Sequence, residues 1–299
     1  NAVYSMTLSH TLCCSFVFLG TELSAYHNEG SLRPFHVITR EGTILNSRPG
    51  ALTAATPGRI GNLIFPCVLS VLSQALPQRA VATWGRGTCA FLPVGIDPRT
   101  NKTYVRSSFC AIGGAGAVYG YDGYQCCGLG DTLGAVSKAD VEDEMVRFPW
   151  RVKTYEFLTD SCGAGKWRGA PGIWWEIVNE GGDCLAHGSG GGLHTQVQGQ
   201  QGGHPTPFGK GYTLHGTERV DVEHGHVERH FKDRDIIVSL GGGGAGVGPP
   251  EERDPEAVRM DVKNELVSIE AARDIYKVVL VADSMEIDYD ATQRLRGKN

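Results

Sequence analysis

Residues 160–169, DSCGAGKWRG, place a thiol, an ammonium and a guanidinium group among three glycines. Cys162 would serve as a nucleophile if a nearby base and positive charge ionised its thiol. Lys166 and Arg168 would supply that charge, or would bind an anionic group such as a carboxylate, a phosphate or a species derived from bicarbonate. The segment is therefore the first candidate for chemistry in this chain.

The structural alternative for the same segment is a turn between two strands. In that case the glycines let the chain bend, and both cations form ion pairs with a neighbouring strand. No histidine lies close to Cys162 in the sequence, so a structural cysteine is favoured. Lys166 and Arg168 are kept as candidates for binding an anion.

Two histidines with metal-ligand spacing stand in EHGHVERH, residues 223–230. In a strand, His224 and His226 would point to the same side, where both imidazoles can bind one metal ion. The charged residues around them favour a solvated surface, so no metal site is predicted and His224 and His226 are kept as the alternative. Further histidines in the polar segment 181–216, His204 among them, lack a carboxylate at ligand spacing.

HNEG, residues 27–30, precedes an apolar stretch, and Asn28 and Glu29 would either cap that turn or face a cleft. These patterns leave the catalytic residues unidentified. The candidates for catalysis are Glu29, Lys166 and Arg168, and the candidates for binding substrate are Asn28, Asp160 and His204.

Nucleotide-binding patterns are incomplete in this chain. Gly241, Gly243 and Gly246 match G-x-G-x-x-G after a predicted strand, but two prolines follow and the next helix starts only near Asp254. A dinucleotide site needs the helix to start within the loop, because its N-terminus binds the pyrophosphate. GAGKW, residues 163–167, lacks the spacing and the Ser/Thr of a Walker A motif. The glycines therefore favour a loop that approaches another backbone or subunit closely.

Composition excludes several classes of protein. The 299 residues carry a net charge of −5, which argues against a nucleic-acid partner. Nine cysteines without a C-x-x-C pair favour free thiols in a reducing cytoplasm. The opening 20 residues lack a basic start and a cleavage motif, so neither a signal peptide nor a membrane span is predicted. Because the chain opens with Asn, we expect a piece of something longer or a processed product.

Hydrophobic spacing predicts the clearest helix at residues 56–77, with Thr56 as its cap, Pro57 at its first position and a kink at Pro66. Beyond residue 80 the pattern changes to short β-type runs, including a hairpin around Asp97. Strands are predicted at 104–112, 147–158, 172–178, 234–240 and 277–281. Capping residues predict short C-terminal helices after Asp254, Ser268 and Asp288.

These elements predict an α+β fold, in which strand-rich mixed sheets carry a buried N-terminal helical part and short C-terminal helices. Residues 1–79 would form the helical part and residues 80–299 the strand-rich part. We expect the two to be one continuous structural unit.

Four stretches together resemble the hydantoinase B/oxoprolinase family, in that family's order: HNEGSLRPFHVITREGTILN, RFPWRVKTYEFLTDSCGAGKWRGAPG, IIVSLGGGGAGVGPPEERDP and VKNELVSIEAARDIYKVVL. GHPTPFGKGY and the C-terminal DIYKVVL and MEIDYDATQRLRG look closer to the large subunits of acetone and acetophenone carboxylases. The resemblance covers only the C-terminal part of the family's B-type subunit. The chain would therefore be that portion, or a split subunit.

The resemblance implies an assembly. A hydantoinase A-type partner subunit would bind ATP, and the B-type subunit would share in the chemical step that follows. ATP and a divalent metal would serve the whole complex, and neither would be bound mainly by this chain. In a ketone carboxylase, phosphorylation would activate bicarbonate and the ketone, whose enol form then attacks the carboxyl donor. The isolated chain would be inactive.

Two alternatives stay open beside ketone carboxylation. One is ATP-dependent cleavage of a cyclic amide, as in a hydantoinase or 5-oxoprolinase, and the other is a scaffold subunit without a reacting group. Two departures from the family matter for each. The family's Asp/His metal constellation lies in the N-terminal part and has no counterpart here, and the family loop usually has glycine at the position of Cys162. Neither a metal ligand nor a shared nucleophile is carried over.

Overall fold

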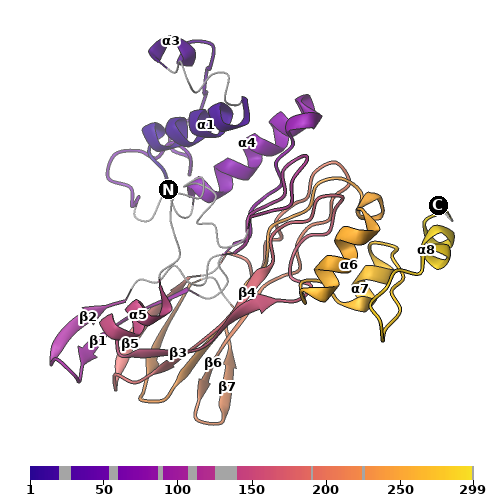
Figure 1. Ribbon diagram of the computed structural model, residues 1–299. Helices are drawn as coiled ribbons and strands as arrows, with labels where there is room; N and C mark the ends of the chain where they lie inside the picture. The colour runs from indigo at the N-terminus through magenta and orange to yellow at the C-terminus, as the bar shows by residue number, and fades with distance from the viewer. Residues whose placement is uncertain are drawn as a thin grey trace.

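The computed structural model describes residues 1–19, 28–53, 60–86, 90–106, 113–124, 140–189, 191–223 and 226–297 (Figure 1). Within them, a helical part at the N-terminal end, two β-sheets and a group of short C-terminal helices are joined by a layer of extended chain. The predicted α+β class is confirmed. None of the described helices combines the length and hydropathy that a membrane crossing requires. The division at residue 79 stays a prediction.

Nine strands form two sheets in the described part of the chain, and every pair between them is antiparallel. The four-stranded sheet has the order β2-β1-β5-β8, with β1 Ala90–Asp97, β2 Lys102–Val105, β5 Cys184–Ser189 and β8 His226–Phe231. The five-stranded sheet has the order β3-β4-β9-β6-β7, with β3 Trp150–Leu158, β4 Gly172–Asn179, β6 Lys210–His215, β7 Glu218–Asp221 and β9 Ile236–Leu240. The predicted hairpin around Asp97 is confirmed as β1–β2, although β2 ends at Val105 and residues 107–112 lie outside the described residues.

The two sheets pack face to face over an aromatic core, because alternate residues of each strand point inward. Phe91 and Phe231 of one sheet meet at 5.4 Å between ring centroids, and Trp150 of the other contacts Phe231 at 5.9 Å. Trp150 also donates its indole N–H to the Tyr104 hydroxyl at 3.0 Å, which satisfies that buried donor. This core holds the sheets in fixed register beneath the extended layer.

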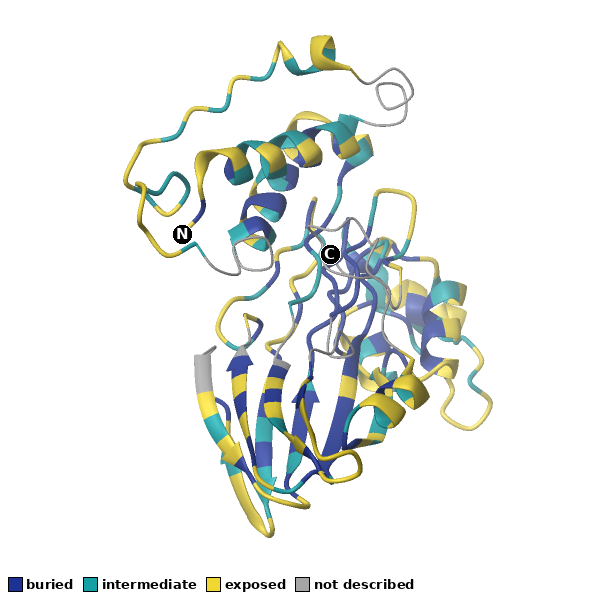
Figure 2. Cartoon of the chain, turned by 90° about the vertical axis from the view of Figure 1, so that its left-hand side faces the viewer, coloured by how far each residue is buried: buried dark blue, intermediate teal, exposed yellow. Residues whose placement is uncertain are grey.

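The N-terminal part contains α1 (Tyr4–Leu19), the single turn α3 (Glu29–Leu32) and α4 (Asn62–Ala75), followed by the short 3₁₀ turn η2 (Pro77–Arg79). α1 and α4 pack through Cys14, Phe18, Phe65 and Leu69. Burial is confined to one face of the pair, and side chains such as Val71, at 66% exposed, lie on the other (Figure 2). Pro66 lies inside α4 as predicted, whereas the predicted cap at Thr56 lies outside the described residues.

The C-terminal helices are α6 (Pro255–Lys263), α7 (Ile269–Asp274) and α8 (Tyr289–Arg296), and the 3₁₀ turn η4 (Pro250–Glu252) precedes them. Their predicted caps are confirmed, since side chains of Asp254, Ser268 and Asp288 accept backbone N–H groups of the first turns. A further helix, α5 (Val141–Arg147), is capped by Asp140 and packs beside β3.

The strand predicted at 277–281 is wrong. Only an isolated bridge joins Leu280 to Ile287. Val278 and Leu280 instead pack into the helical cluster with Val258 and Val262 of α6. Their alternation with polar residues is real, but it serves burial against helices rather than pairing in a sheet.

Between the sheets and the helices, five glycine-rich segments run side by side without regular secondary structure; they are residues 80–86, 113–118, 161–172, 197–206 and 241–249. We call them the glycine layer. Their backbones bond directly across the layer, for example from Ala170 N to Ala115 O at 2.9 Å and from Gly244 N to Ala170 O at 2.8 Å. Most of their residues are buried (Figure 2).

Glycines allow these backbones to approach more closely than any side chain permits. A Cβ on Gly244 would lie 1.8 Å from the carbonyl oxygen of Ala115, and one on Gly169 would lie 1.9 Å from that of Gly244. The same restriction places glycine at the crowded axis of the collagen triple helix. The prediction that the 241–246 loop approaches another backbone is confirmed.

Gly244→Ala tests this packing directly. We expect the substitution to lower the free energy of unfolding by at least about 3 kcal/mol, because backbone cannot move aside as a flexible side chain would. Gly191→Ala is the control, since its new Cβ would lie 3.4 Å from the nearest atom, a methylene of Arg86. Urea unfolding of both variants measures the difference, and equal stabilities would show that the layer is loosely packed.

Candidate functional site

The segment 160–169 forms one strip of the glycine layer, beside the 241–249 strip. Trp167 and Val247 exchange both backbone hydrogen bonds, at 3.0 and 2.9 Å, and Lys166 N donates to Gly248 O at 3.1 Å. This geometry fixes the direction of each side chain in the segment. It confirms the interpretation of the segment as a glycine turn between two strands, β3 and β4.

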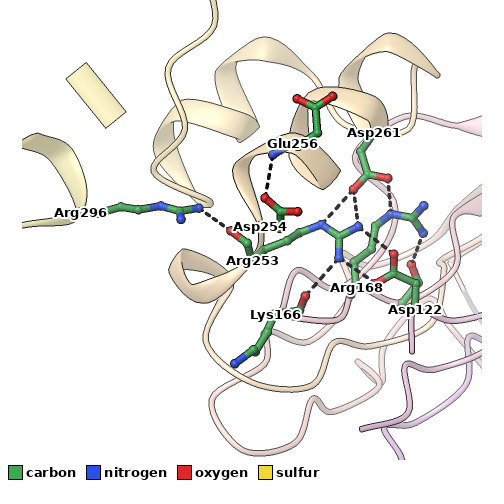
Figure 3. A network of polar contacts seen from close by, with 9 residues as sticks. Asp122, Lys166, Arg168, Arg253, Asp254, Glu256, Asp261 and Arg296 are labelled. Atoms are coloured by element: carbon green, nitrogen blue, oxygen red, sulfur yellow. Dashed lines mark hydrogen bonds and ion pairs between the residues drawn. The ribbon is translucent and has the colours of Figure 1, made fainter. Parts of the chain in front are cut away.

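Arg168 points into a buried cluster of charges with Arg253, Asp122 and Asp261 (Figure 3). Its Nε donates to Asp261 Oδ1 at 2.8 Å, and its own backbone N–H donates to Asp122 Oδ1 at 2.9 Å. Arg253 donates to both oxygens of Asp122 at 2.7 Å and to Asp261 Oδ2 at 2.8 Å. Because Asp261 belongs to α6, the cluster fastens the C-terminal helices to the glycine layer.

Burial makes these ion pairs structural in character. Asp261 and Arg253 are each 4% exposed and Arg168 is 7% exposed. Buried charges are retained only when partners compensate them, and here each guanidinium faces a carboxylate. Of the two predicted roles of Arg168, the geometry therefore favours the ion pair to a neighbouring segment over contact with a free anion.

The pKa of Asp122 reflects the same balance. Burial alone would raise the pKa of this carboxyl, but the hydrogen bonds and charge of Arg253, together with the charge and backbone N–H of Arg168, lower it below its usual value. The carboxylate therefore stays ionised at neutral pH, and its negative charge offsets the two buried guanidinium groups.

Lys166 is the more available of the two predicted anion contacts. Its ammonium lies 3.2 Å from Glu252, and the two side chains are 42% and 53% exposed. The same ammonium lies 5.4 Å from the centroid of the Trp167 ring. An exposed pair of this kind contributes little to stability, so an incoming anion can compete for the lysine.

Cys162 is buried inside the layer. Burial raises the pKa of its thiol to about 11, and the nearby charge of Arg168 only partly opposes this. A thiol with this pKa is almost wholly protonated at neutral pH, whereas a nucleophilic cysteine needs the thiolate. The structural role expected for Cys162 is consistent with this geometry.

Asp160 and His204 make contacts of different kinds. The Asp160 carboxylate accepts the backbone N–H of Ser268 at 2.8 Å and so holds the start of α7. His204 has an exposed side chain, and its backbone bonds to Ala164 and Gly246 within the layer. Their predicted contacts with substrate stay predictions.

Asn28 and Glu29 lie far from the other candidates. Asn28 caps α3 by accepting the Gly30 N–H at 2.8 Å, and Glu29 is exposed in that single turn. α3 stands at the outer end of the N-terminal part, whereas Lys166 and Arg168 lie beside α6 (Figure 1). The structure therefore does not bring Glu29 together with Lys166 and Arg168.

The alternative metal pair receives no support from the described residues. His224 lies outside them, and His226 is placed only as the first residue of β8. Among the described residues, no group of three or more histidine, cysteine, aspartate or glutamate side chains could hold a metal ion. The residues present here thus do not fit a divalent metal.

The G-x-G-x-x-G loop uses its own N–H groups internally. Gly243 N donates to Ser161 O, Gly244 N to Ala170 O, and Gly246 N to His204 O. A phosphate-binding loop must instead direct such groups at the ligand. The loop is built for the layer, and a pyrophosphate would find these donors already occupied.

Sequence reasoning missed Asp122, Arg253 and Asp261. Arg253 stands in one of the stretches that carried the family resemblance, EERDP, which was the only signal available for it. Asp122 lies 131 positions from Arg253 along the chain, and no spacing rule connects residues so far apart.

Comparison with known proteins identifies the family. Its model, described as hydantoinase B/oxoprolinase, matches residues 1–250. The chain belongs to the hydantoinase B/oxoprolinase family. A relative in Pseudomonas jessenii, the beta subunit of caprolactamase, is 30% identical over 94% of this chain and 50% of its own length. The B-type subunit of a putative D-/L-hydantoinase from Pseudomonas sp. (strain NS671) is 29% identical over 90% of this chain and 44% of its own length.

Solved structures share the fold. Nucleotide-free acetone carboxylase superposes with a TM-score of 0.85 at 18% identity, over 99% of this chain and 44% of that one. The ATP-dependent caprolactamase from Pseudomonas jessenii superposes with a TM-score of 0.79 at 24% identity, over 97% of this chain and 51% of that one. This hydantoinase B-family chain thus spans about half the length of the relatives it matches.

Asp122→Asn should destabilise the family member in a pH-dependent way. The folded pKa of Asp122 is lowered, so its stabilisation is present above the unfolded pKa of about 3.9 and is lost as pH falls through the folded value. We expect the variant to be less stable than wild type at neutral pH, and the difference to vanish in acid. Urea unfolding over a series of pH values measures it.

The matched control is Asp274→Asn, which removes an exposed carboxylate paired with the adjacent Arg273. Solvent screens that pair, so the control should change stability less at every pH. A difference for Asp122→Asn that widened in acid would contradict our assignment.

Cys162 should resist alkylation in the folded protein. Cys13 and Cys67 are exposed and should react with iodoacetamide near neutral pH, whereas Cys162 should react only after unfolding, because it is buried and protonated. Peptide mapping by mass spectrometry measures each site. Labelling of Cys162 as fast as Cys13 would restore it as a candidate nucleophile.

Proposed function

We propose that this chain is part of a multi-subunit, ATP-dependent enzyme of the cytoplasm that opens a cyclic amide. The observation that carries the proposal is the 30% identity to the beta subunit of caprolactamase over 94% of this chain. The likeness to the B-type subunit of a putative hydantoinase over 90% of the chain supports the same substrate class. Lactams and hydantoins share a ring amide bond, and breaking that bond is the common chemistry.

Ketone carboxylation is the second candidate, and the C-terminal motifs favoured it in the sequence. It is supported by the superposition on acetone carboxylase and by a 30% identical match to the acetophenone carboxylase delta subunit of Aromatoleum aromaticum. That match covers 28% of this chain and 12% of the relative. The cyclic-amide relatives match over a far longer stretch, so we place amide opening first.

In this proposal ATP binds to a hydantoinase A-type partner subunit. The occupied N–H groups of the 241–246 loop support a nucleotide site elsewhere. A divalent metal, if the complex uses one, would be held by other parts of the assembly, because the described residues of this chain do not fit it.

The chain itself contributes a rigid wall and one candidate contact for an anion. Lys166 is the candidate best placed to bind a phosphorylated or carboxylate intermediate, because its exposed pair with Glu252 is readily exchanged. Arg168 would position this wall through Asp261 rather than touch the substrate. Glu29, Asn28, Asp160 and His204 stay as further candidates, and a pure scaffold remains the alternative if none of them affects turnover.

The test compares ATP hydrolysis by the intact purified complex in two sets of reactions. One set contains caprolactam, hydantoin or 5-oxoproline, and the other contains acetone or acetophenone with bicarbonate. We expect ATP hydrolysis to rise with a cyclic amide and the open-chain amino acid to accumulate. Stimulation only by ketone with bicarbonate would replace the proposal with the second candidate.

Lys166→Ala in the same complex tests the contact. We expect assembly to be retained and kcat/KM to fall by about tenfold or more, the effect of losing one charge-assisted hydrogen bond of about 1.5–3 kcal/mol. Lys263→Ala, on the last turn of α6, is the control. Unchanged turnover in Lys166→Ala would favour the scaffold.

A further inference from the structure

A groove of about 450 Å³ lies between the tip of the β1–β2 hairpin and the end of α5. Arg99 spans its base, because its Nη1 donates to the Met145 carbonyl at 3.0 Å and so joins the hairpin to the helix. The groove is lined by Asp97, Arg99, Thr100, Lys102, Thr103, Tyr104, Val146 and Arg147. Its volume falls within the usual range of binding clefts, and it lies well away from Lys166 and the charge cluster (Figure 1).

The groove follows the free edge of β2. β2 is the terminal strand of its sheet and pairs only with β1 among the described strands. Lys102, Thr103 and Tyr104 are consecutive and all line the groove. Because successive side chains of a strand point to opposite faces, a groove that touches all three must run along the strand's edge, where N–H and C=O groups are unpaired.

Proteins usually protect such edges with charge. The edge strand β7 of the other sheet does so, since Glu218, Arg219 and Asp221 occupy three of its four positions. β2 carries one charge, Lys102, and otherwise Thr103, Tyr104 and Val105. Of these two edges, β2 is therefore the more open to another strand.

The charges of the lining select for an acidic partner. Three cations, Arg99, Lys102 and Arg147, face one carboxylate, Asp97. Asp97 is 4% exposed and already bound by Arg99 at 2.8 Å. Lys102 has no ion-pair partner among the described residues, and the Arg147 side chain is 67% exposed. The net positive lining would attract carboxylates.

Aliphatic side chains flank the same edge. Val146 of α5 is 75% exposed, Val105 of β2 is 62% exposed, and Ile96 of β1 is 57% exposed. Ile96 is paired with Thr103 across the β1–β2 ladder, so it lies one strand in from the groove. An incoming strand with alternating side chains would place aliphatic residues against this surface and acidic ones toward the cations.

We propose that this groove binds an extended, acidic segment of a partner chain, in which carboxylates alternate with aliphatic residues and which adds to β2 as an extra strand. Main-chain hydrogen bonds to the β2 edge supply affinity, and the cations supply specificity. The inference goes beyond the proposed reaction and rests on it only in requiring a partner chain. Binding is measured without ATP or substrate, so its failure and that of the proposed reaction are distinguishable.

The test uses fluorescein-labelled peptides EVEVEVE and KVKVKVK with the 299-residue chain at low ionic strength, followed by fluorescence anisotropy. We expect the acidic peptide to bind at least tenfold more tightly than the basic one. Lys102→Glu should weaken binding by about tenfold, whereas Lys210→Glu, the same change on an exposed position of β6, should leave it unchanged. The acidic peptide should also slow hydrogen exchange at residues 102–105.

Backbone pairing has its own control, an EVEVEVE peptide N-methylated at alternate residues. It keeps every charge but cannot donate along one edge, so it should bind at least tenfold more weakly. No binding of EVEVEVE, equal binding of the acidic and basic peptides, equal effects of Lys102→Glu and Lys210→Glu, or undiminished binding of the N-methylated peptide would each overturn the proposal.

Discussion

Direct backbone-to-backbone contact in the glycine layer is the constraint on which this molecule depends. Five strips of chain exchange hydrogen bonds without the side-chain spacing of an ordinary sheet, so carbonyl oxygens occupy the positions where Cβ atoms would otherwise lie. The layer contributes few apolar side chains of its own. Its stability rests on satisfied buried N–H and C=O groups, whose loss without replacement is costly.

The charge cluster solves the problem of attaching helices to such a layer. Glycine strips offer little apolar surface, so α6 is fastened by Asp261 to Arg168 and Arg253 instead. Arg296, in the last turn of α8, adds a hydrogen bond to the Arg253 carbonyl at 2.6 Å. Residues from four regions of the chain thus meet at one place (Figure 3), and the resulting rigidity suits a wall against which partner subunits complete a site.

Family membership and geometry agree on a division of labour. The relatives are the beta subunit of a caprolactamase and the B-type subunit of a putative hydantoinase, and one solved structure with this fold is acetone carboxylase. The described residues of this chain present neither a metal-ligand group nor a glycine loop with free N–H donors. A fold shared by amide-opening and ketone-carboxylating enzymes is therefore consistent with a common wall that serves different chemistries.

Local signals in the sequence determined the elements: the caps at Asp254, Ser268 and Asp288, the β1–β2 hairpin, β3, β4 and β9, and the family itself. These follow from neighbouring residues, because capping and alternation act within a few positions. Tertiary structure alone decided that residues 277–281 pack against helices, that Arg168 meets Asp261 across 93 positions, and that Glu29 stands apart from Lys166. Those outcomes depend on which segments meet in space, and the glycine layer sets those meetings through backbone contacts that leave no periodic mark on side-chain types.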